Sequence, residues 1–436
     1  MKTGQNLYEK AKKIIPGGNM LLSKRPEMFL PKHWPSYYSK AKGCQVWDLD
    51  GNKYVDMSIM GIGTNTLGYG QAEVDKAVYN TIKKGNLSTF NCPEEVYLAE
   101  ELIEMNPWGD MVKFARTGGE ANAIAIRIAR AASGKDGVAI CGYHGWHDWY
   151  LSTNLNNDQD NLSSHLLPGL DTNGVPKSLK NTAFPFNYNN LEELESIVKK
   201  NEIGVIKMEV VRNYGPENNF LQKIRKLATN NGIVLIFDEC TSGFRETYGG
   251  ISKKFNVYPD IIIFGKTIGN GYALNAIVGR KEIMSAAQNT FISSTFWTER
   301  IGPSAALKTL EIMKKIESWE LITSIGKKFQ LNLKEIAQKH NIKINLSGIP
   351  SLTTYSFSSR NTLKYKTYIT QEMLKNGFLA STHFYSCIKH TDKFLTKYFN
   401  VLDSIFYTIN KCEKDELNID KLLDGPVCHS GFKRLN

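Results

Sequence analysis

Short apolar runs alternate with helical patterns through the middle of this chain, and this alternation restricts the possible folds more than any other feature. A strand that is apolar along its whole length is buried on both faces, and in a sheet this requires helices on both sides. We therefore expect an α/β fold with a mainly parallel sheet, whose ligands bind at the carboxyl ends of the strands. The runs are Val138–Cys141, Val205–Glu209, Val234–Phe237, Ile261–Phe264 and Asn275–Gly279.

Two of these runs are closely followed by residues that carry chemistry, Asp238 after Phe237 and Lys266 after Phe264-Gly265. An ammonium beside apolar surface has a lowered pKa, so its neutral amine becomes available to attack carbonyl carbon. Together the two residues meet the needs of pyridoxal 5'-phosphate (PLP). The lysine holds the aldehyde as a Schiff base, and the carboxylate keeps the pyridine nitrogen protonated. The alternative is a lysine that reaches out of a strand end into solvent.

The composition argues against several other classes of protein. The 54 lysine and arginine residues give a net charge of +11, but they are dispersed rather than gathered into a stripe, which argues against nucleic-acid binding. No signal peptide is visible and no long uninterrupted apolar window occurs, so we expect no membrane segment. The seven cysteines are scattered without a CxxC pair, which indicates reduced thiols and a cytoplasmic location.

The sequence around the two strand ends resembles a known signature. Phe237–Arg245, followed by Phe264-Gly265-Lys266, is similar to that of the class III (subgroup II) PLP-dependent aminotransferases. Within them it is most similar to the glutamate-1-semialdehyde 2,1-aminomutase branch. The resemblance implies that Lys266 and Asp238 are catalytic, and that Thr241 is among the cofactor contacts.

The resemblance extends from about Ile15 to about Thr391 and implies the fold type I of PLP-dependent transferases. It predicts a large PLP-binding domain at 66–315, and a smaller α+β domain formed by both termini at 1–65 and 316–436. The segment Gly43–Asp56 independently reads as a hairpin, because Asp50-Gly51-Asn52 at its centre is a typical turn.

A phosphate site is predicted where Phe114–Ala121 opens a helix of regular 3.6-residue period. Gly118 and Gly119 at its start let the backbone approach a phosphate, which the free amides and the positive helix end then bind. The family usually has Ser-Gly-Thr-Glu where this chain has Thr117-Gly118-Gly119-Glu120, so the backbone carries more of the binding here.

Further contacts follow from the resemblance. Tyr143 corresponds to a tyrosine that packs on the cofactor face. Thr295 corresponds to a threonine that reaches the phosphate of the neighbouring subunit, which implies a homodimer with shared active sites. Glu209 corresponds to a glutamate near the substrate, although an ordinary strand-end carboxylate is the alternative. His144-Gly145-Trp146-His147 has no further cysteine or histidine nearby, so no metal site is expected.

The long polar stretch Leu151–Lys180 is predicted to be a lid over the active site, because loops of this length inside a compact domain are often functional. In the aminomutase branch an arginine shortly after Pro-Gly-Gly binds the substrate carboxylate. Here that place falls on Lys24, with Arg25 adjacent. A lysine lacks the bidentate fork that suits a carboxylate but serves well for a phosphate.

These departures, together with the unusual segment Trp297–Pro303, favour an aminotransferase. We expect an amino-acid donor, glutamate being the first candidate, and a small anionic keto or aldehyde acceptor with or without a phosphate group. Similarity to polysaccharide-cluster relatives suggests a surface-polysaccharide precursor. The alternatives are an isomerase of the glutamate-1-semialdehyde 2,1-aminomutase type and a catalytically silent PLP-fold binding protein.

Overall fold

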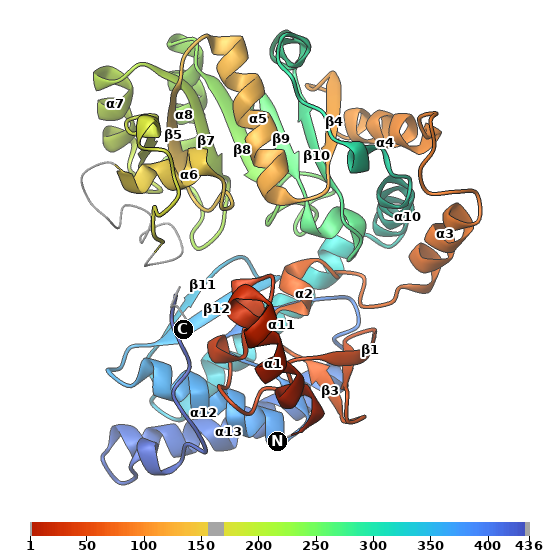
Figure 1. Ribbon diagram of the computed structural model, residues 1–436. Helices are drawn as coiled ribbons and strands as arrows, with labels where there is room; N and C mark the ends of the chain where they lie inside the picture. The colour runs from red at the N-terminus through yellow and green to blue at the C-terminus, as the bar shows by residue number, and fades with distance from the viewer. Residues whose placement is uncertain (1, 156–169, 432–436) are drawn as a thin grey trace. The chain divides into compact units, whose positions relative to one another are not determined.

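The computed structural model describes residues 2–155 and 170–431 of the chain (Figure 1). Contacts within the chain divide it into two compact units. One is Ala72–Trp319, here called the large unit, and the other combines Met1–Gln71 with Glu320–Asn436, here called the small unit. The seven cysteines are free thiols, and all except Cys240 are buried.

The large unit is built on a sheet whose strands follow the order β4-β10-β9-β8-β7-β5-β6. Strands β9, β8, β7, β5 and β6 are parallel, so the predicted α/β fold with a mainly parallel sheet is confirmed. Strand β10 runs antiparallel to both β9 and β4. The strands are β4 (Met111–Ala115), β5 (Gly137–Cys141), β6 (Ala183–Pro185), β7 (Ile203–Glu209), β8 (Val234–Glu239), β9 (Ile261–Phe264) and β10 (Asn275–Gly279).

The helix that matters most for the site is α5 (Gly118–Ser133), which lies across one face of this sheet (Figure 1). Its residues Ile124 and Ile128 join Val205, Ile236 and Ile263 from the strands in one buried core. Burial of each such side chain stabilises the folded chain by about 1.5–3 kcal/mol and holds α5 against the sheet. Because α5 begins at Gly118, shortly after β4 ends at Ala115, its start lies at the carboxyl ends of the parallel strands. The other helices of this unit are α3 (Ala72–Ile82), α4 (Pro93–Glu104), α6 (Asp148–Leu151), α7 (Leu191–Lys200), α8 (Phe220–Asn230), α9 (Lys281–Met284) and α10 (Ile301–Ile316).

The small unit contains two sheets, ordered β1-β2-β3-β13 and β11-β12-β14. The predicted hairpin is present, since β2 and β3 pair antiparallel and the Asp48 carboxylate accepts hydrogen bonds from the amides of Asp50 and Asn52 in the turn. The strands are β1 (Tyr38–Lys42), β2 (Gln45–Asp48), β3 (Lys53–Asp56), β11 (Ile344–Ser347), β12 (Leu352–Phe357), β13 (Phe378–Leu379) and β14 (His383–Tyr385).

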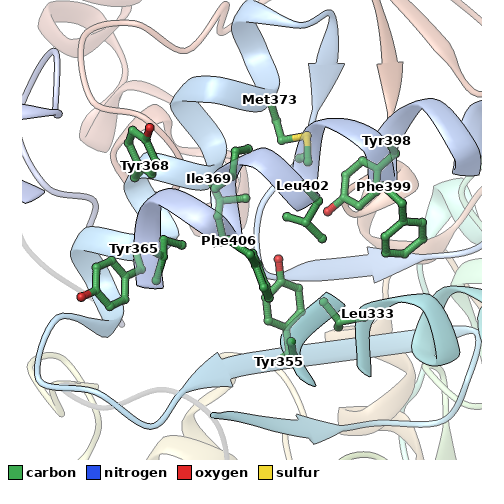
Figure 2. Close-up of a cluster of buried hydrophobic side chains, with 14 of the residues drawn as sticks. Leu333, Tyr355, Tyr365, Tyr368, Ile369, Met373, Tyr398, Phe399, Leu402 and Phe406 are labelled. Carbon is green, nitrogen blue, oxygen red and sulfur yellow. The ribbon is translucent and has the colours of Figure 1, made fainter. Parts of the chain in front are cut away.

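Helices cover these sheets and enclose an aromatic core, part of which Figure 2 shows around Tyr355, Leu402 and Phe406. Phe329 stacks on Phe384 with ring centroids 4.1 Å apart, and aliphatic side chains such as Ile369 and Leu402 pack in the same core. The helices are α1 (Thr3–Ile14), α2 (Met60–Gly63), α11 (Ser318–Lys339), α12 (Thr362–Lys375) and α13 (Asp392–Glu413). Across residues 2–155 and 170–431, no helix combines the length and apolar character needed to cross a membrane.

The predicted lid is described only in part, because residues 156–169 lie outside the described residues. At the start of this stretch, residues 152–154 are buried in a short 3-10 helix, and the role of the stretch as a lid stays a prediction. The hydroxyls of Ser152 and Thr153 donate to backbone carbonyls three residues earlier, and Asn154 Nδ2 donates to the carbonyl of Leu170 at 2.9 Å. Local hydrogen bonds of this kind remove the cost of burying a polar side chain.

Candidate active site

Lys266 lies two residues after the end of β9, with Gly265 between them. Its backbone is held in the left-handed region with φ 42°. A non-glycine residue in that region is strained, which is typical of functional positions. Its Nζ donates a hydrogen bond to Thr241 Oγ1 at 2.7 Å. Burial of the ammonium, with the Arg212 guanidinium nearby, lowers the pKa of Lys266 to about 8. The amine is therefore placed and activated for attack on a carbonyl carbon.

The close packing before Lys266 leaves no space for a side chain at position 265. A Cβ on Gly265 would lie 2.1 Å from Asn275 Oδ1 and 3.1 Å from the Cys240 sulfur. Because Asn275 opens β10 and Cys240 directly follows β8, this glycine lets three strand ends approach one another.

Asp238 lies at the end of β8 with only 3% of its surface exposed. Its Oδ1 accepts a hydrogen bond from the Cys240 amide at 3.1 Å, and its Oδ2 lies 2.9 Å from His144 Nδ1 and 3.4 Å from Lys207 Nζ. Burial alone raises the pKa of Asp238, but the Lys207 ammonium and the His144 ring together hold it well below its usual range. The carboxylate is therefore ionised despite its burial.

The two partners of Asp238 were not predicted from the sequence, where His144 was considered only as a metal ligand and Lys207 was not considered. Each carries a detectable signal in hindsight. Lys207 is a charged residue inside an apolar strand, and His144 lies three residues after the end of β5, a strand of the same sheet as the one that carries Asp238. His144 is fully buried between Asp238 and the Cys141 carbonyl. Burial lowers the pKa of His144, so the neutral ring donates through Nδ1 to the carboxylate, the nearer acceptor.

The start of α5 supplies unsatisfied backbone donors. The Thr117 hydroxyl accepts from the Glu120 amide, and the Glu120 carboxylate accepts from the Thr117 amide, which together form a capping box. Among the described residues, none accepts a hydrogen bond from the amides of Gly118 or Gly119. A Cβ on Gly119 would lie 2.7 Å from His147 Cε1. The bulky ring of His147 therefore explains why a larger residue does not stand here.

Glu209 ends β7 and connects three parts of the site. Its Oε2 accepts from the Tyr143 amide at 3.0 Å, and Arg212 Nη1 donates to Oε1 at 3.0 Å. The Tyr143 ring meets Tyr150 edge-on, with centroids 6.0 Å apart. Arg212 was also missed by the sequence analysis, because it lies in a loop outside any recognised motif. Its guanidinium is close enough to Lys266 to lower the pKa of that residue.

These groups fit the parts of PLP. Backbone amides at a helix start suit a phosphate, a half-buried amine of lowered pKa suits the aldehyde, and an ionised buried carboxylate suits the ring nitrogen. The profile of the family described as aminotransferase class-III matches residues 31–401. The chain belongs to this family. It is thus a PLP-dependent class III aminotransferase, as the sequence analysis expected from the resemblance.

The relatives of this class III aminotransferase are named for two different reactions. It is 33% identical to the 3-aminobutyryl-CoA aminotransferase of Cloacimonas acidaminovorans, over 96% of this chain and 97% of the relative. It is 31% identical to the glutamate-1-semialdehyde 2,1-aminomutase of Methanocaldococcus jannaschii, over 93% and 98%. The FumI protein of Sphingopyxis sp. MTA144, solved in a PLP form, has the same fold, with a TM-score of 0.85 at 23% identity over 96% and 99% of the two chains.

The structure of this class III aminotransferase places most of the predicted site residues in the large unit. Lys24 and Arg25 belong to the small unit, where Lys24 is exposed. Arg25 packs over Gly17, whose added Cβ would meet Arg25 Nη2. Thr295 begins a short exposed 3-10 helix of the large unit. The roles of these three residues stay predictions.

Proposed function

We propose that this enzyme transfers an amino group from an amino-acid donor, glutamate being the first candidate, to a small anionic keto or aldehyde acceptor. The acceptor is expected to carry a carboxylate or a phosphate. A surface-polysaccharide precursor is the proposed class of acceptor, and this proposal rests on the resemblance alone. The observation that carries the anionic preference is Arg212.

Arg212 is a cation that the reaction centre itself does not require. It lies three residues after β7, pairs with Glu209, and retains 24% of its side-chain exposure. The Arg212 guanidinium contributes to the lowered pKa of Lys266. A substrate bound at Lys266 is therefore also close enough to interact electrostatically with Arg212. An arginine fork binds a carboxylate or phosphate through two parallel hydrogen bonds, which supports an anionic substrate.

The other residues have roles that follow from their placement. When bound, PLP supplies an aldehyde for the amino group and a ring that accepts carbanion electrons. Lys266 Nζ, neutral above about pH 8, is positioned by Thr241 to accept and return a proton at the carbon that carries the amino group. Asp238 holds a proton at the ring nitrogen, and Gly118 with Gly119 binds the phosphate. Tyr143 would contact the ring when the cofactor is bound, and Glu209 orients Arg212.

The aminomutase reaction is the second candidate, because relatives at 31% identity carry that name. Lys266 serves both reactions and does not distinguish them. The difference lies in release. A transaminase frees an oxo acid after the first half of its cycle, whereas a mutase keeps its substrate until the amino group has moved.

The deciding experiment therefore measures oxo-acid release. The holoenzyme is incubated with glutamate, other common amino acids or 3-aminobutyryl-CoA, each without acceptor. We expect one donor to give stoichiometric release of its oxo product, and an anionic aldehyde or keto compound to restore the starting absorbance. Rapid isomerisation of glutamate-1-semialdehyde without any added donor, and with no oxo acid released, would instead establish the mutase.

Replacement of Arg212 tests the anionic preference separately. Arg212→Met should raise the KM of the anionic substrate more than it changes kcat, as expected when a uniform binding contact is lost. Arg225→Met is the matched control, because Arg225 has 23% side-chain exposure and pairs with Asp260 in the same unit. Equal effects of the two substitutions on KM would mean that Arg212 does not support the proposed preference for an anionic substrate.

A further inference from the structure

One charged group beside the active site has no task in the proposed reaction. Lys207 lies within β7, all seven of whose residues are buried, and its own side chain is fully buried. A buried ammonium is costly unless a carboxylate pairs with it. The pairing carboxylate here is Asp238, whose Oδ2 lies 3.4 Å from Lys207 Nζ.

The geometry follows from the sheet. Strand β7 runs parallel to β8, with Lys207 opposite Ile236 and Glu209 opposite Asp238. Lys207 is therefore on the same face as Asp238 and lies two residues nearer the amino ends of the strands. Residues of opposite charge on neighbouring strands attract across this short separation.

The surroundings of Lys207 offer few other charges. The groups that act on its ammonium are Asp238, Glu209 and Cys240, and Lys207 in turn acts on His144. Helix α5 packs against the same strand, and all its residues are described. Its buried side chains are uncharged, with Asn122 as the polar one. Burial lowers the pKa of Lys207, while the Asp238 carboxylate opposes that shift.

We propose that Lys207 is a positioning residue that acts through Asp238: its ammonium takes up part of the carboxylate charge and weakens the hold of Asp238 on a proton at the ring nitrogen of the cofactor. This inference rests on the proposed role of Asp238 toward the ring. Two cations that share one carboxylate repel each other, so each binds its proton less tightly than it would alone. A ring that loses its proton more easily is a weaker acceptor of carbanion electrons. Lys207 thus limits the strength of the electron sink.

The test is a direct measurement of the ring nitrogen. Holoenzyme carrying cofactor labelled with ¹⁵N in the ring is followed by NMR as a function of pH, as the native protein and as Lys207→Met. Methionine replaces the ammonium with an uncharged chain of similar length. We expect the ring nitrogen of Lys207→Met to keep its proton to a pH about one unit or more higher, the scale of shift that one nearby charge produces.

The matched control is Lys253→Met. Lys253 is a partly buried lysine of the same unit, but its ammonium donates to the carbonyls of Met105 and Tyr248 rather than to Asp238. Its replacement should leave the ring titration unchanged. If Lys207→Met does not yield folded protein, Lys207→Gln keeps a hydrogen-bonding side chain and removes the same charge, so the same rise is expected.

The outcomes separate two ideas. If the ¹⁵N shifts of the native protein and the uncharged Lys207 variant coincide over the whole pH range while Asp238→Asn displaces them, the role of Lys207 is refuted and that of Asp238 stands. If Asp238→Asn leaves the shifts unchanged as well, Asp238 does not act on the ring, and the proposed role of Asp238 fails with it.

Discussion

At the scale of single residues, the site depends on two groups whose pKa values are both lowered, which makes the Lys266 amine readily neutral and keeps the Asp238 carboxylate ionised. Lys266 is buried enough to lose its proton easily, and its left-handed backbone holds Nζ against Thr241. Asp238 is more deeply buried and yet ionised, because the Lys207 ammonium compensates its charge and His144 donates a hydrogen bond to it. Burial alone would neutralise both groups, so the neighbours decide which one stays charged.

The first prediction concerns the pH at which Lys266 reacts. The folded pKa of about 8 lies below the ordinary lysine value of about 10.4, so between these two values Nζ is neutral while exposed lysines remain protonated. In protein freed of cofactor, a carbonyl reagent followed by borohydride should therefore label Lys266 selectively at about pH 9, and much less at about pH 6. Peptide mass mapping gives the site. Labelling spread evenly over many lysines at the higher pH would contradict the activated amine.

The second prediction concerns Asp238. Asp238→Asn should still bind PLP but lose about a thousandfold in turnover, roughly 4 kcal/mol, because an amide does not hold a ring proton as a carboxylate does. Cofactor content is measured by absorbance and turnover by product formation. Near-normal turnover with full cofactor occupancy would mean that Asp238 is structural.

At the scale of elements, the sequence predicted the strands whose side chains are buried along their whole length. Strands such as β7 and β8 are apolar on both faces, so their position and the chemistry at their ends are visible from the sequence. The antiparallel direction of β10 was not predicted, because an apolar run carries no sign of its direction. The contacts of His144 and Lys207 with Asp238 span 94 and 31 residues, and no local pattern encodes such pairs.

The third prediction tests how the phosphate end of α5 is held. Thr117→Ala removes the hydroxyl that caps the Glu120 amide and should lower the free energy of unfolding by about 1 kcal/mol, the usual cost of losing such a cap. Thr117→Ser keeps the hydroxyl and should lose much less. The denaturant midpoint of the cofactor-free protein measures both variants. A serine variant as unstable as the alanine variant would assign the effect to the lost methyl group.

At the scale of the whole molecule, exposed aromatic side chains favour the proposed homodimer. Phe90, Phe291 and Phe296 are 87%, 83% and 71% exposed in the single chain. The Asn86 carbonyl accepts from the Arg300 amide at 2.9 Å, which ties the segment before Phe90 to the one that follows Thr295. Exposed aromatic rings are typical of interaction sites, and the exposed Thr295 directly precedes Phe296 in the chain.

The last prediction asks whether two chains share each active site. If Thr295 of one chain serves the phosphate bound beside Lys266 of the other, a heterodimer of Lys266→Ala and Thr295→Ala has one site with both lesions and one with neither. Mixing the two variants, at a cofactor concentration too low for Thr295→Ala alone, should therefore restore part of the activity. The control mixes Lys266→Ala with Asp238→Asn. Both of those residues lie in the large unit of one chain. Asp238 accepts from the Cys240 amide and the Lys266 ammonium acts on the Cys240 thiol, so the two serve the same site and neither site of that heterodimer is intact. Recovery in both mixtures, or in neither despite demonstrated subunit exchange, would contradict a threonine contributed across the interface.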